Sequence, residues 1–215
     1  MMMGPETFYC EHLEGKDANE VLKVLRRLKR ENTALKRRIE NPNYSPKHAV
    51  KPDEKAIIWA NRLYVDRCKE ALEQLGVTYV PTKAETKAAE VEAKLEHVEK
   101  VKLEIRGFLT GFTTWTLAVN GDSVSLEKEG ILPKPMYEKI EDYIDREELL
   151  LCLRELYLGE WKRRYDAYDY GCCIMDGEQW TLTVYVGKDS KPIVFEGCNA
   201  YPYNWDDVLD LVNRE

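Results

Sequence analysis

The chain has 215 residues, of which 44% are hydrophobic and 33% are charged, and its formal net charge is -7. This length suits one domain, or a small domain with an appendage, and the composition provides a core beneath a strongly charged surface. No apolar run approaches the roughly 20 residues that span a bilayer, and the first residues lack the basic and apolar pattern of a secretory signal. We therefore expect no membrane contact and a cytoplasmic location.

Cysteine and histidine limit the chemistry that the sequence predicts. Six cysteines without a secretory signal indicate reduced thiols. Cys10 and His12 are the only close Cys/His pair, and no second pair completes a zinc site. No histidine follows His97, and no phosphate-binding or hydrolase motif occurs. The sequence predicts a protein that is not an enzyme, with no catalytic residue, metal or cofactor; a hydrolase that uses the tyrosines and acids of residues 165–176 is a remote alternative.

The first 15 residues are expected to be disordered, and residues 17–40 are expected to form a helix because they lack glycine and proline. The apolar positions of this helix recur at the alternating steps of a coiled coil, with one asparagine among them. These positions are Val21, Leu25, Leu28, Asn32, Leu35 and Ile39. The pattern resembles a short leucine zipper and predicts self-association, with Asn32 fixing the register of two parallel chains. The residues before it are mostly acidic, so the DNA-reading role of basic zippers does not carry over.

A competing interpretation keeps this helix inside one molecule. Leu22 and Val24 widen the apolar face beyond a two-residue seam, which favours packing on a globular body. A second helix is expected over residues 53–75 and has a broad apolar face, so the two helices could pair as a hairpin. A third helix over residues 82–97, with a narrow alanine-rich face, completes a helical region that spans residues 16–97.

The charge is divided unevenly along the chain. Residues 1–121 carry 21 basic and 18 acidic residues, whereas residues 122–215 carry 11 and 21. The basic excess is concentrated in the first long helix, at Arg26, Arg27, Lys29, Arg30, Lys36, Arg37 and Arg38. These residues are candidates for contact with nucleic acid or an acidic partner. The alternative is a solvated helix face, since acids are interleaved.

Residues 98–215 are expected to form an α+β domain. Residues 98–106 fit either a strand or a continued helix, and we predict a strand because glycines follow. Two hairpins are expected beyond it, the first turning at Asn120-Gly121. Residues 133–160 are expected to be helical with a break near residue 145, and Asn204 is expected to cap a final helix. The sequence thus predicts an antiparallel sheet of four or five strands with helices on one face.

Two short motifs near the C-terminal end of the sequence are similar to motifs of other proteins. Asp176-Gly-Glu-Gln-Trp180 and the segment from Gly197 to Trp205 resemble a recurring C-terminal domain of uncharacterised bacterial and mobile-element proteins. No catalytic role comes with this resemblance. The motifs have structural explanations: a tight Asp-Gly turn, a positive φ or bulge at Gly197, and an asparagine bonded to its own backbone. The alternative is a ligand or partner surface made of Asp176, Trp180, Asn199, Tyr201 and Trp205.

Three functions are consistent with these features. The first is a non-enzymatic interaction or regulatory protein whose N-terminal helices mediate self-association, as in a homodimer, or bind a protein partner. The second is a mobile-element anti-defence inhibitor, similar to an anti-CRISPR, that occludes a nucleic-acid-processing effector. The third is a protein that binds nucleic acid directly through its basic helix.

Overall fold

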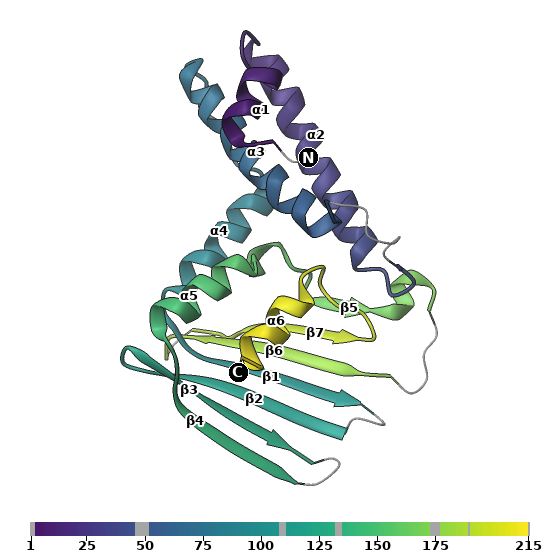
Figure 1. Ribbon diagram of the computed structural model, residues 1–215, viewed down its shortest axis with the longest axis vertical. Coiled ribbons are helices and arrows are strands. Elements are labelled where there is room, and N and C mark those ends of the chain that lie inside the picture. Colours follow the sequence, from purple (N-terminus) through teal and green to yellow (C-terminus); the bar gives the residue numbers. More distant parts are fainter. Residues whose placement is uncertain are drawn as a thin grey trace. The chain divides into compact units, whose positions relative to one another are not determined.

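The computed structural model describes residues 3–45, 52–107, 111–131, 135–172, 177–188 and 190–214. The chain is α+β and divides into two compact units, Met1–Pro81 and Thr82–Glu215 (Figure 1). We call them the N-terminal unit and the C-terminal unit. The boundary lies before the third predicted helix and not at residue 98, so the predicted division into a helical region and a sheet domain is corrected: the third helix belongs with the sheet.

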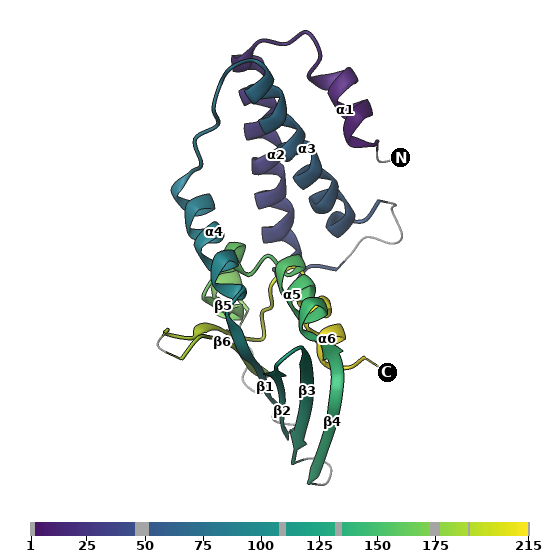
Figure 2. The same ribbon diagram turned by 90° about the vertical axis from the view of Figure 1, so that its left-hand side faces the viewer.

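The N-terminal unit consists of α1 (Pro5–His12), α2 (Ala18–Ile39) and α3 (Glu54–Gln74). Figure 2 shows α2 and α3 side by side along their lengths. The helix α2 begins with a capping box, in which Asp17 accepts from the backbone N–H of Glu20 and Glu20 accepts from that of Asp17. The bounds of α2 and α3 agree with the two predicted helices within one residue.

The prediction that residues 1–15 are disordered is wrong, because the structure places a helix there. Phe8 and Leu13 are each only 3% exposed, and the Phe8 ring stacks on Tyr64 of α3 with centroids 4.2 Å apart. Pro5 stands at the start of α1, where its missing N–H costs nothing. This short segment gains its order from the apolar surface of α3, which local sequence patterns do not reveal.

The C-terminal unit contains a sheet with strand order β4-β3-β2-β1-β6-β7-β5 among the described residues. All neighbouring strands are antiparallel except β5 and β7. The strands are β1 (Val98–Gly107), β2 (Gly111–Asn120), β3 (Ser123–Gly130), β4 (Met136–Asp145), β5 (Arg164–Asp166), β6 (Gln179–Val186) and β7 (Ile193–Cys198). The predicted strand at 98–106 and both predicted hairpins are confirmed, and the sheet is larger than the four or five strands expected.

The helices of this unit are α4 (Lys83–Leu95), α5 (Arg146–Glu155) and α6 (Trp205–Val212), with short 3-10 helices η1 (Leu158–Glu160) and η2 (Ala167–Tyr170). As predicted, α5 and α6 cover one face of the sheet (Figure 1). Leu103 of β1 lies opposite Trp115 and Leu182, and all three are buried beneath these helices. The alternate residues point to the other face, where Lys102 and Glu104 form an ion pair of 3.1 Å.

Part of the alanine-rich face of α4 packs within the C-terminal unit. It packs against η1 so closely that a Cβ added at Gly159 would lie 2.5 Å from the Cα of Ala88. Leu95 at the end of α4 is fully buried in the core of the sheet. The helix is therefore an integral part of the C-terminal unit.

The largest error of the sequence prediction concerns residues 136–145, which form the strand β4 and not the first half of a helix. Ile140 pairs with Leu126 and Ile144 with Val124, so β4 holds extra residues in a bulge between these pairs. Asp142 within the bulge has a φ of 51°. The bulge interrupts the two-residue alternation of the strand, because Tyr143 within it packs toward the core beside Ile144. The apolar residues of β4, at positions 136, 137, 140, 143 and 144, are therefore spaced as they would be on a helix.

No helix in the described ranges is long and apolar enough to cross a membrane.

Candidate functional site

The face predicted to mediate self-association is the core of the N-terminal unit. Val21, Leu25 and Leu28 are 0%, 1% and 4% exposed, and they pack in one cluster with residues of α3. Leu35 is also buried, and Ile39 is half-buried. The helix hairpin within one chain, the competing interpretation of the sequence, therefore accounts for this face, and no dimer partner is needed to cover it.

Asn32 serves this hairpin and not a pair of identical helices. Its side-chain oxygen accepts a 2.9 Å hydrogen bond from the side-chain nitrogen of Asn61 on α3, and its own nitrogen donates to the carbonyl oxygen of Ile58 at 3.3 Å. An asparagine in an otherwise apolar interface selects the partner position that satisfies it. Here that position lies on the same chain.

The opposite side of α2 carries positive charge. At 100° per residue, Lys23, Arg26, Arg27, Arg30 and Arg37 fall within about 60° of one line, and the buried residues lie on the other side of the helix. All five side chains are exposed. We call them the basic face of α2. From Lys23 to Arg37 this face extends about 21 Å at 1.5 Å per residue.

The structure separates the seven predicted basic residues into two groups. Arg26, Arg27, Arg30 and Arg37 belong to the basic face, whereas Lys29, Lys36 and Arg38 lie outside it. The nitrogen of Lys29 donates to the Tyr79 hydroxyl at 2.5 Å and lies 4.6 Å from the centre of that ring, so this lysine is engaged within the unit.

Two further residues of α2 differ from the predicted contact set. Arg38 lies 3.7 Å from Glu54 and so ties the end of α2 to the start of α3. Lys23 was missing from the predicted contact set, although its spacing of three, four and seven residues from Arg26, Arg27 and Arg30 places it on their face.

Acidic side chains in the described ranges leave the arginines of the basic face without ion pairs. Among the described residues, no acidic side chain pairs with Arg26, Arg27 or Arg37. Arg30 donates from Nε to the carbonyl oxygen of Arg26, and this bond uses only one of its five N–H donors. Four planar guanidinium groups in one row form a surface suited to phosphate oxygens, which arginine binds through two parallel hydrogen bonds.

The second predicted site, in the C-terminal unit, is largely core. Trp180 is 1% exposed and donates from Nε1 to the carbonyl oxygen of Ala200 at 2.9 Å, and Trp205 packs against it with ring centres 4.5 Å apart. Gly197 allows this packing: a Cβ there would lie 2.3 Å from Trp180 Nε1. The predicted positive φ or bulge at Gly197 is therefore replaced by a close approach of the indole ring.

The polar residues of this predicted site are bonded to the neighbouring backbone and to one carboxylate. Asn199, with a φ of 51°, accepts from the backbone N–H of Glu178 at 2.7 Å and not from its own backbone. Tyr201 donates to the Glu178 carboxylate at 2.7 Å. Burial and this hydrogen bond raise the pKa of Tyr201. Asp176 lies outside the described residues.

Asn204 does not cap α6 as predicted. Its side chain is 2% exposed, accepts from Trp161 Nε1 at 3.1 Å and donates to the carbonyl oxygen of Leu156 at 2.9 Å. These bonds join the segment before α6 to the end of α5. The polar side chain of Asn204 thus holds the two covering helices together.

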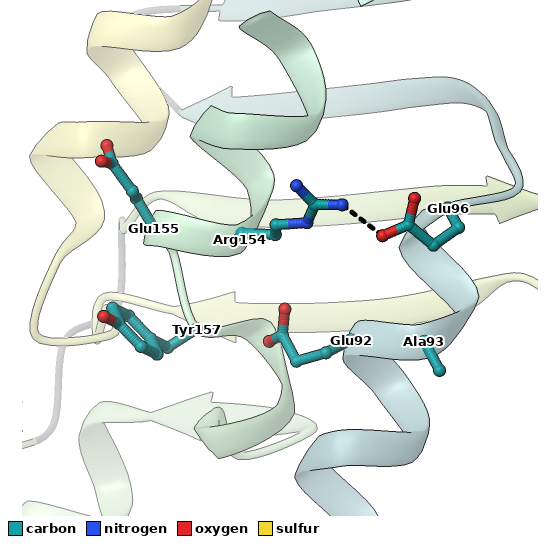
Figure 3. A pocket seen from close by; sticks show the side chains of 6 residues that line it. All are labelled: Glu92, Ala93, Glu96, Arg154, Glu155 and Tyr157. Atoms are coloured by element: carbon teal, nitrogen blue, oxygen red, sulfur yellow. Dashed lines mark hydrogen bonds and ion pairs between the residues drawn. The ribbon is translucent and has the colours of Figure 1, made fainter. Parts of the chain in front are cut away.

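A depression of about 420 Å³ lies between α4 and the end of α5 (Figure 3). Its lining residues are Glu92, Ala93, Glu96, Arg154, Glu155 and Tyr157. Figure 3 shows Arg154 directed from α5 toward Glu96 at the end of α4, with which it forms an ion pair. The hydrogen bond to Arg154 lowers the pKa of Glu96, so this carboxylate stays ionised and paired and is poorly suited to donate a proton.

In the described part of the chain, no three His, Cys, Asp or Glu side chains are grouped so that they could hold a metal ion. Comparisons of the chain with protein-family models, curated proteins and solved structures found no match. The resemblance to a bacterial and mobile-element domain therefore stays a prediction. Among the described surfaces, the basic face of α2 has the chemistry best suited to binding an anionic group.

Proposed function

We propose that this protein is a non-enzymatic interaction protein that binds nucleic acid through the basic face of α2. The observation that carries this proposal is the arrangement of Lys23, Arg26, Arg27, Arg30 and Arg37 in one exposed row, opposite the side of the helix that packs on α3.

The geometry of this row suits a phosphate backbone. A duplex carries one negative charge per about 1.7 Å of its axis, so a row about 21 Å long meets several phosphates at once. The hairpin with α3 holds α2 as a helix before any ligand arrives, so little conformational entropy is lost on binding. The row lies in the N-terminal unit, whose 15 basic and 12 acidic residues give it a positive balance within an acidic protein.

The same arrangement bears on the alternative of self-association. The apolar side of α2 is covered by α3 of the same chain, and two basic faces would repel each other. A nucleic acid satisfies the charge of this face, and a second copy does not.

The test is the salt dependence of binding to a fluorescent 20-base-pair DNA duplex, measured by anisotropy between about 50 and 200 mM salt. Five phosphate contacts predict a slope of about -4.5 in a plot of log affinity against log salt. The triple variant Arg26→Gln, Arg30→Gln, Arg37→Gln should reduce the slope to about -2 and weaken binding throughout.

The matched control removes three positive charges from α4. Lys83→Gln, Lys87→Gln and Lys94→Gln change exposed residues outside the basic face, so binding and slope should stay close to those of the unmodified chain. Absence of binding at the lowest salt would reject the proposal. Equal losses in the two triple variants would show that overall charge, and not this face, attracts the nucleic acid.

The acidic balance of the C-terminal unit supports a second candidate function. Residues 82–215 carry 27 acidic and 17 basic residues, and such a surface is suited to a cationic nucleic-acid channel. In this candidate the protein is an anti-defence inhibitor that occludes an RNA-guided nuclease. Purified nuclease with guide RNA and target duplex should then cleave more slowly when the full chain is added, and unchanged cleavage at saturating protein would argue against it for that nuclease.

A further inference from the structure

The edge strand β4 is an unusually open element of the C-terminal unit. It stands at one end of the strand order and pairs only with β3 among the described residues. From Met136 to Asp142 every residue is exposed, on both faces of the sheet. The opposite edge strand, β5, is only three residues long.

The apolar residues on β4 and just before it distinguish this edge from an ordinary solvated one. Met136, Tyr137 and Ile140 are 44%, 62% and 37% exposed, and the nearby Ile131 is 58% exposed. The register places Met136 and Ile140 on the helix-covered face and Tyr137 on the other. Each face of this edge therefore offers an apolar contact to a neighbouring strand.

The bulge fixes how much of β4 can accept a further strand. The pairing with β3 is regular from Met136 to Ile140, and Asp142 then has a φ of 51°, in the left-handed region. A bulge ends regular pairing on its edge. The five residues of the regular stretch, at about 3.3 Å per residue, accommodate an extended segment about 16 Å long.

The negative charge of this edge determines which kind of segment can pair with it. Glu138, Glu141 and Asp142 are exposed carboxylates, and the single lysine of the strand, Lys139, is shared between Glu141 at 2.7 Å and Glu127 at 3.5 Å. Opposite charges on facing strands stabilise a pair, and like charges weaken it. A second copy of β4 would bring two acidic strands together, whereas a basic strand would be complementary.

We propose that Met136–Ile140 at the free edge of β4 binds an extended, basic segment of a partner protein by adding it to the sheet as a further strand. The backbone groups of β4 supply hydrogen bonds, Glu138 and Glu141 face basic side chains on the two sides of the sheet, and Met136, Tyr137 and Ile140 contact apolar ones. This surface belongs to the C-terminal unit and is independent of the basic face of α2.

The probe is a synthetic octapeptide in which pairs of lysines alternate with pairs of valines, so that each face of the added strand carries both lysine and valine; it is titrated into the ¹⁵N-labelled full-length chain and followed by NMR. Amide shifts should change along residues 136–141 and in their neighbours on β3. A peptide with alternate backbone amides N-methylated, and one with glutamate in place of lysine, should each bind at least tenfold more weakly.

The variant Glu138→Lys, Glu141→Lys should weaken binding of the lysine peptide about tenfold and improve binding of the glutamate peptide. The control Glu73→Lys, Glu90→Lys makes the same change of charge at exposed residues outside β4 and should leave both affinities within about twofold.

Three results would overturn the proposal. Shifts spread over all acidic surfaces would mean that the peptide binds by charge alone. A sedimentation mass of two chains, with amides 136–141 protected from exchange before peptide is added, would assign the edge to a second copy. If no amide resonance shifted at millimolar peptide, the charges and the bulge of β4 would be features that prevent the edge from pairing with another strand.

Discussion

The side-chain amide of Asn61 donates a 2.9 Å hydrogen bond to the side-chain oxygen of Asn32, and this bond joins the two long helices of the N-terminal unit. Asn61 is 5% exposed. A zipper pattern assigns Asn32 to a contact between chains, but Asn32 is paired within one chain. Substitution of Asn32 tests this difference.

We expect Asn32→Leu to lower the free energy of unfolding by about 1–3 kcal/mol, because the buried amide of Asn61 loses its acceptor. The double variant Asn32→Leu, Asn61→Leu should recover much of this loss, since an apolar pair replaces the polar one. Urea denaturation measures both effects. Sedimentation should give the same mass for all three proteins; a change of mass in Asn32→Leu would instead support a contact between chains.

The limits of α2 and α3 could be predicted from the sequence because their signals are local. Asp17 and Glu20 form a capping box, and three basic residues follow in the last turn of α2. Periodicity also showed which side of α2 is apolar. It could not show what covers that side, since an apolar face looks the same whether it meets a second chain or α3.

The basic face could be predicted only in part. Composition marked residues 26–38 as basic, but helical geometry and tertiary contacts decide which charges are presented together. Lys29 is turned toward Tyr79 and is engaged there. The strand β4 was missed for a related reason: its apolar residues have a helical spacing, and the bulge at Asp142 that interrupts the strand alternation depends on the neighbouring strand.

The stacking of Phe8 on Tyr64 predicts that α1 contributes to the stability of the N-terminal unit. Phe8→Ala should lower the free energy of unfolding by about 3 kcal/mol, as expected for removal of a buried aromatic ring. The control Glu11→Ala changes an exposed residue of the same helix and should cost less than about 0.5 kcal/mol. Equal unfolding midpoints for the two variants would mean that α1 is not part of this core.

The thiol of Cys68 predicts a loss of stability in alkaline solution. Burial raises its pKa from 9.0 to about 11, and Arg27 and Lys16 oppose this shift only in part. In the unfolded chain the thiol ionises near its ordinary pKa, while the folded protein keeps it protonated. The contribution of Cys68 is therefore complete below pH 9 and falls as the pH rises through 9 to 11, by about 2 kcal/mol at most.

Urea denaturation of the unmodified chain and of Cys68→Ala at several pH values measures this contribution. The difference in stability between the two proteins should shrink as the pH rises toward 11, because only one of them carries the buried thiol. Cys10→Ala removes an exposed thiol and should leave the pH dependence unchanged. A constant difference between the unmodified chain and Cys68→Ala across this range would contradict the assignment.

The contact between Gly197 and Trp180 predicts that a small substitution at Gly197 strongly destabilises the C-terminal unit. In Gly197→Ala the new methyl group would lie 2.3 Å from Trp180 Nε1, so the buried indole would have to move and its hydrogen bond to Ala200 would be strained. We expect a loss of about 3 kcal/mol in the free energy of unfolding, together with a changed near-ultraviolet circular dichroism spectrum. Gly130→Ala makes the same change in another strand, where the nearest side-chain atom is 3.5 Å away, and should cost less than about 1 kcal/mol. If the two variants were equally stable and their spectra alike, the close approach of the Trp180 ring to Gly197 would not be what requires glycine at this position.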